Sequence, residues 1–548
     1  MHENALIPGT IYGDEMATAG ANTGEYKLDV KRDRLVIAAS SLGTVFEWYD
    51  FFIYGTLAAI IGRTFFPTDN ASVELLYSLA GFAVGFGFRP LGAVLFGYFG
   101  DRLGRKYTFL ATIIMMGIAT AGVGLVPSAA SIGAAAPVIL IILRIMQGLA
   151  LGGEYGGAAI YVAEHAPVER RGFFTSFIQA SVVGGFILSL IVVLGTQWIV
   201  GPEAWDAWGW RIPFVFSLVL LGISLWIRLK LNESPVFKAM KDAGECARNP
   251  LKETFTYPGN KKRLFVALFG IAAGLTVIWY TAMFQVLYFL QNALRVEPVT
   301  AQILVGIGAT SGLFWFLFFG HLSDKYGRKK PIVLGYAATL LLLFPIFHLI
   351  GGAANPSLAE AARRAPVVVM GPDCGYDPFA KVQASDCSRL LDYFSKKGVH
   401  YDKAAASSTQ VSVAGVVQTD TSPAALDKTL AEAGYNLDKV KPSFVDSLKI
   451  LLGILTLGAL SGATYGPVAA LLSELFPARI RYSSMSIPYH IGTGYFGGFL
   501  PLVSQYIVAR TGDPYAGLWY TMAVVAMALV VTMWGLPETR GARLDAKG

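Results

Sequence analysis

Hydrophobic positions in this chain fall in long runs, and most charged positions fall in the short segments between the runs. A helix that crosses a lipid bilayer needs about 20 predominantly apolar residues. Twelve runs reach that length, six before and six after a polar segment at 231–262, and each predicts a membrane-spanning helix. The predicted helices cover residues 35–62, 74–99, 107–126, 137–163, 173–200, 209–230, 263–291, 300–321, 331–351, 447–474, 483–510 and 515–536. We therefore predict an all-α membrane protein with two six-helix halves.

A second polar segment, residues 352–446, separates predicted helices nine and ten and contains no run that could span a bilayer. Its residue pattern predicts β-strands near 366–370 and 410–418 and helices at 385–397 and 422–433. This segment therefore predicts a small α/β insert. The expected organisation is a tail at 1–34, six helices at 35–230, a linker at 231–262, helices seven to nine at 263–351, the insert at 352–446, helices ten to twelve at 447–536 and a tail at 537–548.

Two short motifs occur once in each half, between predicted helices. The loop Gly97–Lys106 has the pattern Gly-x-x-x-Asp-Arg-x-Gly-Arg-Lys, and Gly320–Lys329 repeats it with Lys in place of the first Arg. The pattern Glu-x-x-Pro that begins at Glu164 returns at Glu474, again followed by two arginines. The second copies lie farther apart than the first because the insert falls between them. The two halves are therefore an internal duplication.

The distribution of basic residues predicts the orientation of the chain, because Lys and Arg accumulate in cytoplasmic loops. With the N-terminus inside, most loop Lys and Arg fall on one side, and the other side carries Arg63, Arg295 and Arg510 outside the insert. We therefore expect both termini to be cytoplasmic and the insert to lie outside. The net charge of +7 then reflects topology, and no nucleic-acid partner is expected. The first 34 residues lack an apolar core, so no cleavable signal peptide is predicted.

The repeated loop is similar to the signature of the major facilitator superfamily, and four further segments resemble its metabolite:proton symporter branch. These segments are Phe46–Gly55, Arg89–Gly92, Arg144–Ala158 and Tyr489–Pro501. The resemblance covers the twelve helices and leaves out the insert. It implies a multi-pass transporter of the bacterial inner membrane that imports a small solute, such as a dicarboxylate, citrate, shikimate, proline or betaine, together with protons. We expect a monomer in the lipid bilayer with no cofactor beyond the coupling proton.

Two charged residues of the first half are predicted at the same depth. A charge inside a spanning helix costs several kcal/mol unless it faces a cavity or a partner, so it is a functional candidate. At a rise of about 1.5 Å per residue, Asp50 lies roughly 22 Å and Arg144 about 20 Å above the inner face. Helices one and four line the cavity in the superfamily, so we expect Asp50 and Arg144 to meet. Protonation of Asp50 would then release Arg144 to hold an anionic substrate, and a static ion pair is the alternative.

Further residues complete the set of candidates. Glu47 and Glu154 join Asp50 and Arg144 as candidate proton-coupling residues. Arg89 is predicted near the depth of Glu154, and it either pairs with that carboxylate or binds the substrate. The other candidate substrate-binding residues are polar or aromatic: Tyr54, Gln147, Tyr280, Gln285, Tyr465, Tyr489 and His490. His490 is either a proton relay or a packing residue.

The repeated loop is a candidate gate. In the superfamily its acidic residue pairs with basic residues and with a helix end, and the contact closes the cytoplasmic side. The candidate gate residues are Asp101, Arg102, Gly104 and Arg105 in the first half and Asp324, Lys325, Gly327 and Arg328 in the second. A basic loop that only sets topology is the alternative, and the repeated spacing favours the gate.

Two of the three cysteines, Cys374 and Cys387, lie in the insert, and Cys246 lies in the linker. An oxidising compartment favours a disulfide between the first two, and two free thiols are the alternative. The sequence contains no Walker loop, no His-Glu-x-x-His and no Cys-x-x-Cys. We therefore expect neither an enzyme nor a metal site.

Import of a small organic anion, such as a di- or tricarboxylate, by proton symport is the function that the buried arginines and the resemblance favour. A zwitterionic osmolyte, such as proline or betaine, is the second candidate substrate, because Glu47, Asp50 and Glu154 suit a cationic head group. A non-transporting sensor that binds a ligand or partner through the insert is the third reading, and the retained gate loops and intramembrane charges disfavour it.

Overall fold

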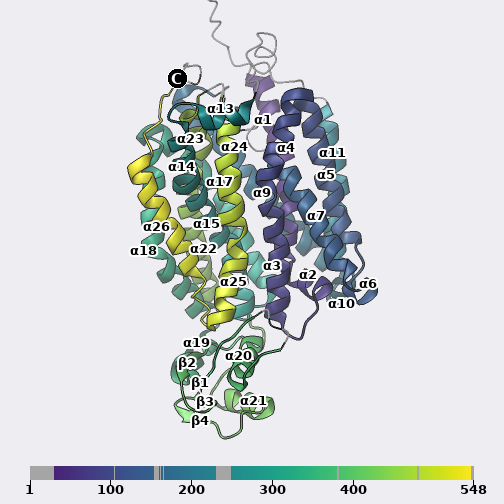
Figure 1. The fold of residues 1–548 in the computed structure, drawn as a ribbon, viewed down its shortest axis with the longest axis vertical. Helices are drawn as coiled ribbons and strands as arrows, with labels where there is room; N and C mark the ends of the chain where they lie inside the picture. Colours follow the sequence, from purple (N-terminus) through teal and green to yellow (C-terminus); the bar gives the residue numbers. More distant parts are fainter. Residues whose placement is uncertain are drawn as a thin grey trace, which may run out of the picture.

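The computed structural model describes residues 30–544 apart from 104, 154–158, 161, 164–165, 230–248, 379, 381, 478–479 and 543. Each of the twelve predicted crossings corresponds to helices in these residues. Nine of the described helices are long and apolar enough to cross a bilayer on length and composition alone. The predicted all-α architecture is therefore confirmed, and Figure 1 shows the helices as one bundle with the insert at one end.

The first half supplies six crossings, two of which are interrupted. Its first crossing is α1 (Val30–Thr56) with α2 (Ala58–Phe65), and its second is α3 (Ala71–Gly87) with α4 (Arg89–Leu103). The remaining helices are α5 (Arg105–Leu125), α6 (Ala129–Ile132), α7 (Ala135–Gly152), α9 (Arg171–Val200), α10 (Pro202–Ala207) and α11 (Ile212–Leu229), with single turns η1 (Val168–Arg170) and η2 (Gly209–Arg211). The breaks lie at Leu57 and at Phe88, which directly precedes Arg89-Pro90.

The second half also supplies six crossings, and two of them contain π-helical turns. The short helix α13 (Pro250–Thr256) leads into the seventh crossing, which is α14 (Asn260–Phe265), η3 (Val266–Ala272), α15 (Ala273–Tyr280), η4 (Thr281–Gln285), α16 (Val286–Tyr288) and η5 (Phe289–Ala293). The others are α17 (Pro298–Tyr326), α18 (Lys329–Ala354), α22 (Phe444–Tyr465) with α23 (Val468–Leu475), α24 (Arg481–Ile491) with η7 (Gly492–Gly498) and α25 (Leu500–Thr511), and α26 (Leu518–Gly535). Turns of this kind are frequent at functional sites.

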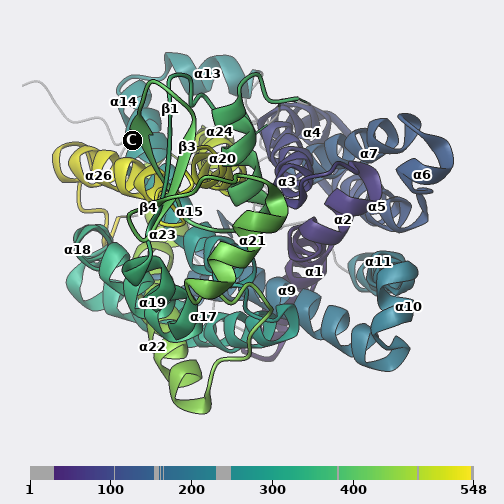
Figure 2. The ribbon, with the colours of Figure 1, turned by 90° about the horizontal axis from the view of Figure 1, so that it is seen from below.

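Two seams join the halves. The eighth crossing, α17, packs along the fifth, α9, and the eleventh crossing packs through η7 and α25 against α3 of the second. Figure 2 shows α3, α5, α7 and α11 on one side and α18, α22 and α26 on the other. Helix α1 begins, and helix α26 ends, toward the face opposite the insert. We call that face the latch face and the other the insert face.

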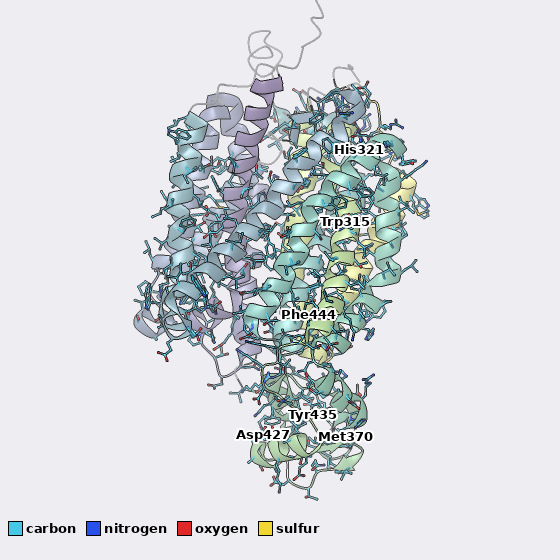
Figure 3. All side chains as sticks on the ribbon, turned by 180° about the vertical axis from the view of Figure 1, so that it is seen from behind. Trp315, His321, Met370, Asp427, Tyr435 and Phe444 are labelled. Atoms are coloured by element: carbon cyan, nitrogen blue, oxygen red, sulfur yellow. A yellow bond between two sulfur atoms is a disulfide. The ribbon has the colours of Figure 1, made fainter. Side chains whose placement is uncertain are left out.

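The insert is a mixed α/β unit, as predicted. It comprises α19 (Pro356–Arg364), β1 (Val367–Gly371), α20 (Asp386–Lys397), β2 (Asp402–Ala405), β3 (Gln410–Val413), β4 (Val416–Val417) and α21 (Pro423–Glu432). The strand order is β2-β1-β3-β4, with β1 parallel to β2 and antiparallel to β3. Figure 3 shows the insert, marked by Met370, Asp427 and Tyr435, beyond the end of the bundle.

The insert has a hydrophobic core of its own. Val369 and Val411 face each other across the sheet, and Leu391 and Phe394 of α20 cover them, all fully buried. Helix α20 begins at a capping box formed by Ser385, and a disulfide joins Cys374 to Cys387 in its first turn. The sequence pattern missed β2, because its four residues are all exposed and show no apolar face.

Glycines bring the second and fourth crossings into backbone contact. A Cβ atom on Gly148 would lie 1.8 Å from the carbonyl oxygen of Gly85, and one on Gly152 would lie 2.0 Å from that of Arg89. Small residues allow this approach between membrane helices. Arg89 and Arg144 therefore project from two helices whose backbones touch.

The substitution Gly148→Ala is expected to lower stability, because its methyl group overlaps the Gly85 carbonyl and forces the helices apart. Overpacking of this kind costs about 1–3 kcal/mol. The unfolding temperature of the purified protein in detergent measures the effect. Gly195→Ala is the matched control, since Gly195 lies inside α9 and a Cβ atom there meets nothing within 4 Å. Equal losses in the two variants would contradict this packing account.

Candidate functional site

Arg144 lies in a buried cluster between the two halves. Its side chain is fully buried, its Nη1 donates to Gln147 Oε1 at 2.5 Å, and Gln147 Nε2 donates to Thr120 at 2.6 Å. The guanidinium carbon lies 4.2 Å from the ring centre of Tyr54 and 4.6 Å from that of Phe51. Nε and Nη2 have no hydrogen-bond partner among the described residues. Arg144 is therefore held in place and retains donors on two nitrogens.

The predicted contact between Asp50 and Arg144 is wrong for this conformation. Both side chains are buried, but within the described part of the chain no hydrogen bond reaches Asp50 Oδ1 or Arg144 Nη2. Asp50 lies beside Ser217 of α11 instead. Successive residues of an α-helix point about 100° apart, so Phe51 faces Arg144 and Asp50 does not. The rise per residue predicts depth but not direction.

Arg89 is a second fully buried arginine in the cluster. Its guanidinium carbon lies 5.2 Å from the ring centre of Trp48 and 5.1 Å from that of Phe86. Glu47, on the same helix as Trp48, is 5% exposed. Glu154, the predicted partner of Arg89, lies outside the described residues. Arg89 is thus stabilised in part by aromatic faces, as Arg144 is.

Four predicted substrate-binding residues of the second half lie at this cluster: Tyr280, Tyr465, Tyr489 and His490, each at most 7% exposed. Three of them, Tyr280, Tyr465 and His490, lie within reach of the charge of Arg89, and Tyr280 also lies within reach of the charge of Arg144. The Tyr280 hydroxyl has no hydrogen-bond partner in the described chain. The cluster therefore combines arginines from one half with aromatic hydroxyls from the other.

Aromatic rings that were not among the predicted site residues form the walls of the cluster. They are Phe51 and Phe52 of α1, Phe82 and Phe86 of α3, and Trp279 and Phe284 of the seventh crossing, each at most 3% exposed. The Tyr280 ring stacks on Phe284 at 5.7 Å and meets Phe86 edge-on at 5.5 Å. The spacing of Phe82 and Phe86, four residues apart on one helix face, is the signal that could have indicated this wall.

Gln285 contacts the eleventh crossing, and its contact with the substrate stays a prediction. It accepts a hydrogen bond from Gln505 of α25 at 3.2 Å. It therefore supports the contact between the seventh and eleventh crossings.

The second-half gate loop forms an ion-pair network at the latch face. Arg328 donates to Asp324 at 2.6 Å and to both oxygens of Glu474 at 3.1 Å. Asp324 accepts from the backbone N–H groups of Gly172 at 2.8 Å and Phe173 at 2.9 Å, at the start of α9. A helix N-terminus favours a carboxylate in this position. The network therefore ties the second half to the first.

Burial alone would lower the pKa of Arg328, but the hydrogen bonds and charges of Glu474 and Asp324 raise it above its ordinary value. Arg171 completes the network with an ion pair to Glu474 at 2.9 Å, and both side chains are almost fully buried. In the sequence, Arg171 and Glu474 stand out only as parts of the repeated motifs. Arg171 is a cation in the first half and Glu474 an anion in the second, and this difference in charge could have indicated a contact between them.

The other predicted gate residues make smaller contributions or fall outside the description. The Lys325 side chain is exposed, and its carbonyl oxygen accepts from Arg540 at 2.6 Å. Gly327 adopts a φ of +96°, which favours glycine, and a Cβ atom there would lie 2.3 Å from Glu538. Gly104 and the side chains of Asp101, Arg102 and Arg105 lie outside the described residues.

The cluster is also closed toward the insert face. Tyr288 of the seventh crossing donates to the carbonyl oxygen of Gly55 in α1 at 2.9 Å. A Cβ atom on Gly55 would lie 2.5 Å from Phe284, so the two helices are in close contact. The structure is therefore closed on both sides of the cluster.

Comparisons with known proteins agree with this architecture. The model of the family described as "Sugar (and other) transporter" matches residues 35–266 and 439–546. The solved structure of XylE, a proton:xylose symporter of the major facilitator superfamily, has a TM-score of 0.61 at 17% identity and covers 94% of this chain and 98% of its own. At this identity the likeness shows the fold alone.

Two relatives cover almost the whole chain. The inner membrane metabolite transport protein YhjE of Escherichia coli (strain K12) is 30% identical, over 91% of this chain and 93% of the relative. The glycine betaine/proline/ectoine/pipecolic acid transporter OusA of Dickeya dadantii (strain 3937) is 29% identical, over 92% of this chain and 84% of the relative. The family match, the relatives and the fold lead to one conclusion: this multi-pass membrane protein belongs to the sugar (and other) transporter family, with the major facilitator fold.

Proposed function

We propose that the protein is a proton-coupled importer of a small zwitterionic osmolyte, of the chemical kind of proline and betaine, in the inner membrane. One observation carries this proposal: at Arg144, unused guanidinium donors lie beside buried aromatic faces. The substrates in the name of the relative OusA support the same class. This substrate class replaces the di- or tricarboxylate that the sequence alone put first.

The substrate carboxylate is assigned to Arg144. Arginine presents N–H groups in a fork that matches a carboxylate, and such charge-assisted bonds are strong. Arg144 uses Nη1 for Gln147, which leaves Nε and Nη2 for a ligand. The unpartnered hydroxyl of Tyr280 supplies a further donor from the other half. A carboxylate between these groups would join the two halves.

The substrate ammonium group is assigned to the aromatic walls. The face of an aromatic ring carries negative potential and attracts a cation, including a quaternary ammonium. The rings of Phe82, Phe86 and Phe284 provide such faces, all fully buried. These faces offer no partner for a second carboxylate, so the aromatic walls favour a zwitterion with one carboxylate.

Proton coupling is assigned to Asp50. A buried carboxylate whose hydrogen bonds are incomplete is expensive as an anion, and Oδ1 of the buried Asp50 has no partner in the described chain. We infer that Asp50 carries a proton while the site is closed and releases it when the site opens to the cytoplasm. The latch face is then the cytoplasmic side, in agreement with the basic loops.

Uptake into proteoliposomes tests the proposed function. Labelled glycine betaine, proline, succinate and citrate are supplied with and without an inward proton gradient. We expect gradient-driven uptake of betaine or proline that neither succinate nor citrate inhibits. Arg144→Gln should reduce uptake by roughly 30-fold or more, as when one partner of a buried charged contact is removed. Asp50→Asn should lose gradient-driven accumulation but retain exchange of labelled for unlabelled substrate.

Arg63→Gln is the matched control, because Arg63 is exposed in an ion pair with Asp206 and lies outside the cluster. It should transport normally. Uptake of a dicarboxylate alone would contradict the substrate class, and normal accumulation by Asp50→Asn would contradict the coupling role. Absence of all uptake in folded protein would contradict transport itself.

We call the ion-pair network at the latch face, with Glu538 beside it, the latch. Its contacts predict that the stability of the protein depends on pH. Burial alone would raise the pKa of Glu538, but hydrogen bonds from the backbone N–H groups of Arg328, Arg540, Lys329 and Thr539 hold it below its ordinary value of 4.5. The stability that this carboxylate contributes is therefore fully present above pH 4.5 and is lost as the pH falls through the lowered pKa.

The unfolding temperature, measured from about pH 7 to about pH 3, follows this contribution, because carboxylates change from charged to protonated over that range. Glu538→Gln should lower the unfolding temperature at neutral pH. The unfolding temperature of the variant should also fall less on acidification than that of the parent protein. Glu432→Gln, at an exposed position in α21, is the control and should match the parent protein. An identical acid dependence in parent and Glu538→Gln would show that Glu538 does not stabilise the latch.

A further inference from the structure

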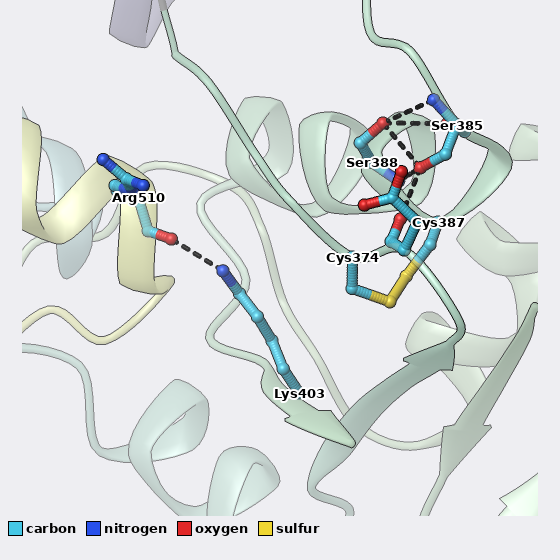
Figure 4. The surroundings of a disulfide bond; sticks show 7 residues. Cys374, Ser385, Cys387, Ser388, Lys403 and Arg510 are labelled. Atoms are coloured by element: carbon cyan, nitrogen blue, oxygen red, sulfur yellow. Dashed lines mark hydrogen bonds between the residues drawn. A yellow bond between two sulfur atoms is a disulfide. The ribbon is translucent and has the colours of Figure 1, made fainter. Parts of the chain in front are cut away.

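The insert is bound tightly to the second half. Beyond its two chain connections, Glu297 N–H donates to the carbonyl oxygen of Val440 at 3.0 Å, and Lys441 pairs with Glu297 at 3.3 Å. Lys403 donates to the carbonyl oxygen of Arg510 at 2.8 Å, as Figure 4 shows. These contacts reach the start of the eighth crossing and the end of the eleventh. The insert therefore moves with the second half.

The same insert also contacts the first half. Asn70, which directly precedes α3, donates through Nδ2 to Asp392 Oδ1 at 2.8 Å and lies 3.4 Å from the hydroxyl of Tyr376. Asn70 is 5% exposed, and α20 packs against α3 at this point. In Figure 2 the insert lies across the insert face, with α20 next to α3. It therefore spans the boundary between the halves.

The groups that bind Asn70 are held as one unit. Tyr376 donates to Asp392 at 3.4 Å, and Lys396 pairs with Asp392 at 3.0 Å. The disulfide joins Cys374, two residues before Tyr376, to Cys387 in the first turn of α20, the helix that carries Asp392. Figure 4 shows this bond beside the capping residues of α20. The acceptor for Asn70 is therefore rigid.

We propose that the insert is a strap across the outer mouth, and that the Asn70–Asp392 hydrogen bond must break each time the halves separate on the insert face. This inference rests on alternating access in the proposed function and is independent of the substrate. Opening that face separates α1 from the seventh crossing, where Tyr288 now binds Gly55. The same movement draws α3 away from the insert. The Asp392 side chain is 22% exposed, so water can replace Asn70 as its partner.

The Asn70–Asp392 hydrogen bond is weak enough to break and re-form in each transport cycle. A hydrogen bond to a charged group contributes more than a neutral one, and its loss shifts an equilibrium by a factor on the order of ten. The insert has its own core and a disulfide, so it does not depend on Asn70 to fold. The contact therefore biases the transporter toward the closed outer face without being required for the structure.

Distance measurement between spin labels tests the strap without any substrate. Labels are attached at Glu203→Cys in α10 and Gly352→Cys in α18, both exposed on the insert face, with Cys246→Ser as background. Asn70→Ala should raise the ratio of long to short distances on the order of tenfold. Asn70→Asp should raise it further, because two carboxylates would then face each other.

Exchanging the partners provides the decisive control. Asn70→Asp combined with Asp392→Asn recreates a carboxylate–amide hydrogen bond and should restore the parent distribution. Asp386→Asn removes an exposed ion pair with Arg389 in the same helix and should change nothing. The proposal is overturned if Asn70→Ala and Asn70→Asp both match the parent, or if the exchanged pair remains open. Failure of the substrate proposal would leave these distances unchanged.

Discussion

A charge buried in a bilayer must find a partner, and this requirement organises the centre of the molecule. Arg144 meets it through Gln147 and the faces of Tyr54 and Phe51, and this arrangement leaves its Nε and Nη2 donors unused in the described structure. The glycine contact between Gly148 and Gly85 brings the arginine-bearing helices together. An incompletely satisfied arginine is therefore a consequence of the helix packing, and the proposed carboxylate ligand would complete it.

The two ends of the cluster are closed by different physical contacts. At the latch face, buried carboxylates and arginines from both halves pair with one another, so separation requires that water replace those partners. Toward the insert face, close contact between α1 and the seventh crossing is supported by a single buried hydrogen bond from Tyr288. The proposed strap adds a charged contact at that end. A cycle of opening at either face would exchange one set of contacts for the other.

Positions along the helices were predictable from the sequence, whereas directions around them were not. Apolar run length was enough to locate all twelve crossings and the insert, because bilayer thickness imposes it. The rise per residue placed Asp50 and Arg144 at one level in the membrane. It could not show that Phe51, and not Asp50, points from α1 toward Arg144. Side-chain direction depends on how neighbouring helices pack, which no single run of residues contains.

The aromatic walls of the cluster could not be predicted from the sequence either. Phe82, Phe86 and Phe284 are unremarkable in apolar runs, where any large hydrophobic residue satisfies the lipid or the core. Their importance comes from converging around two arginines, and that arrangement requires three crossings from two halves to be placed together. The ion pair between Arg171 and Glu474 was easier to predict than the aromatic walls, since both residues lie in motifs that the two halves share.

The most direct test is a structure determined with bound glycine betaine. We predict its carboxylate within about 3 Å of Nε or Nη2 of Arg144 and of the Tyr280 hydroxyl, with the methylated ammonium against the rings of Phe82, Phe86 and Phe284. A ligand whose carboxylate lies elsewhere, with Arg144 still joined only to Gln147, would contradict the assignment of Arg144 as the centre of the site.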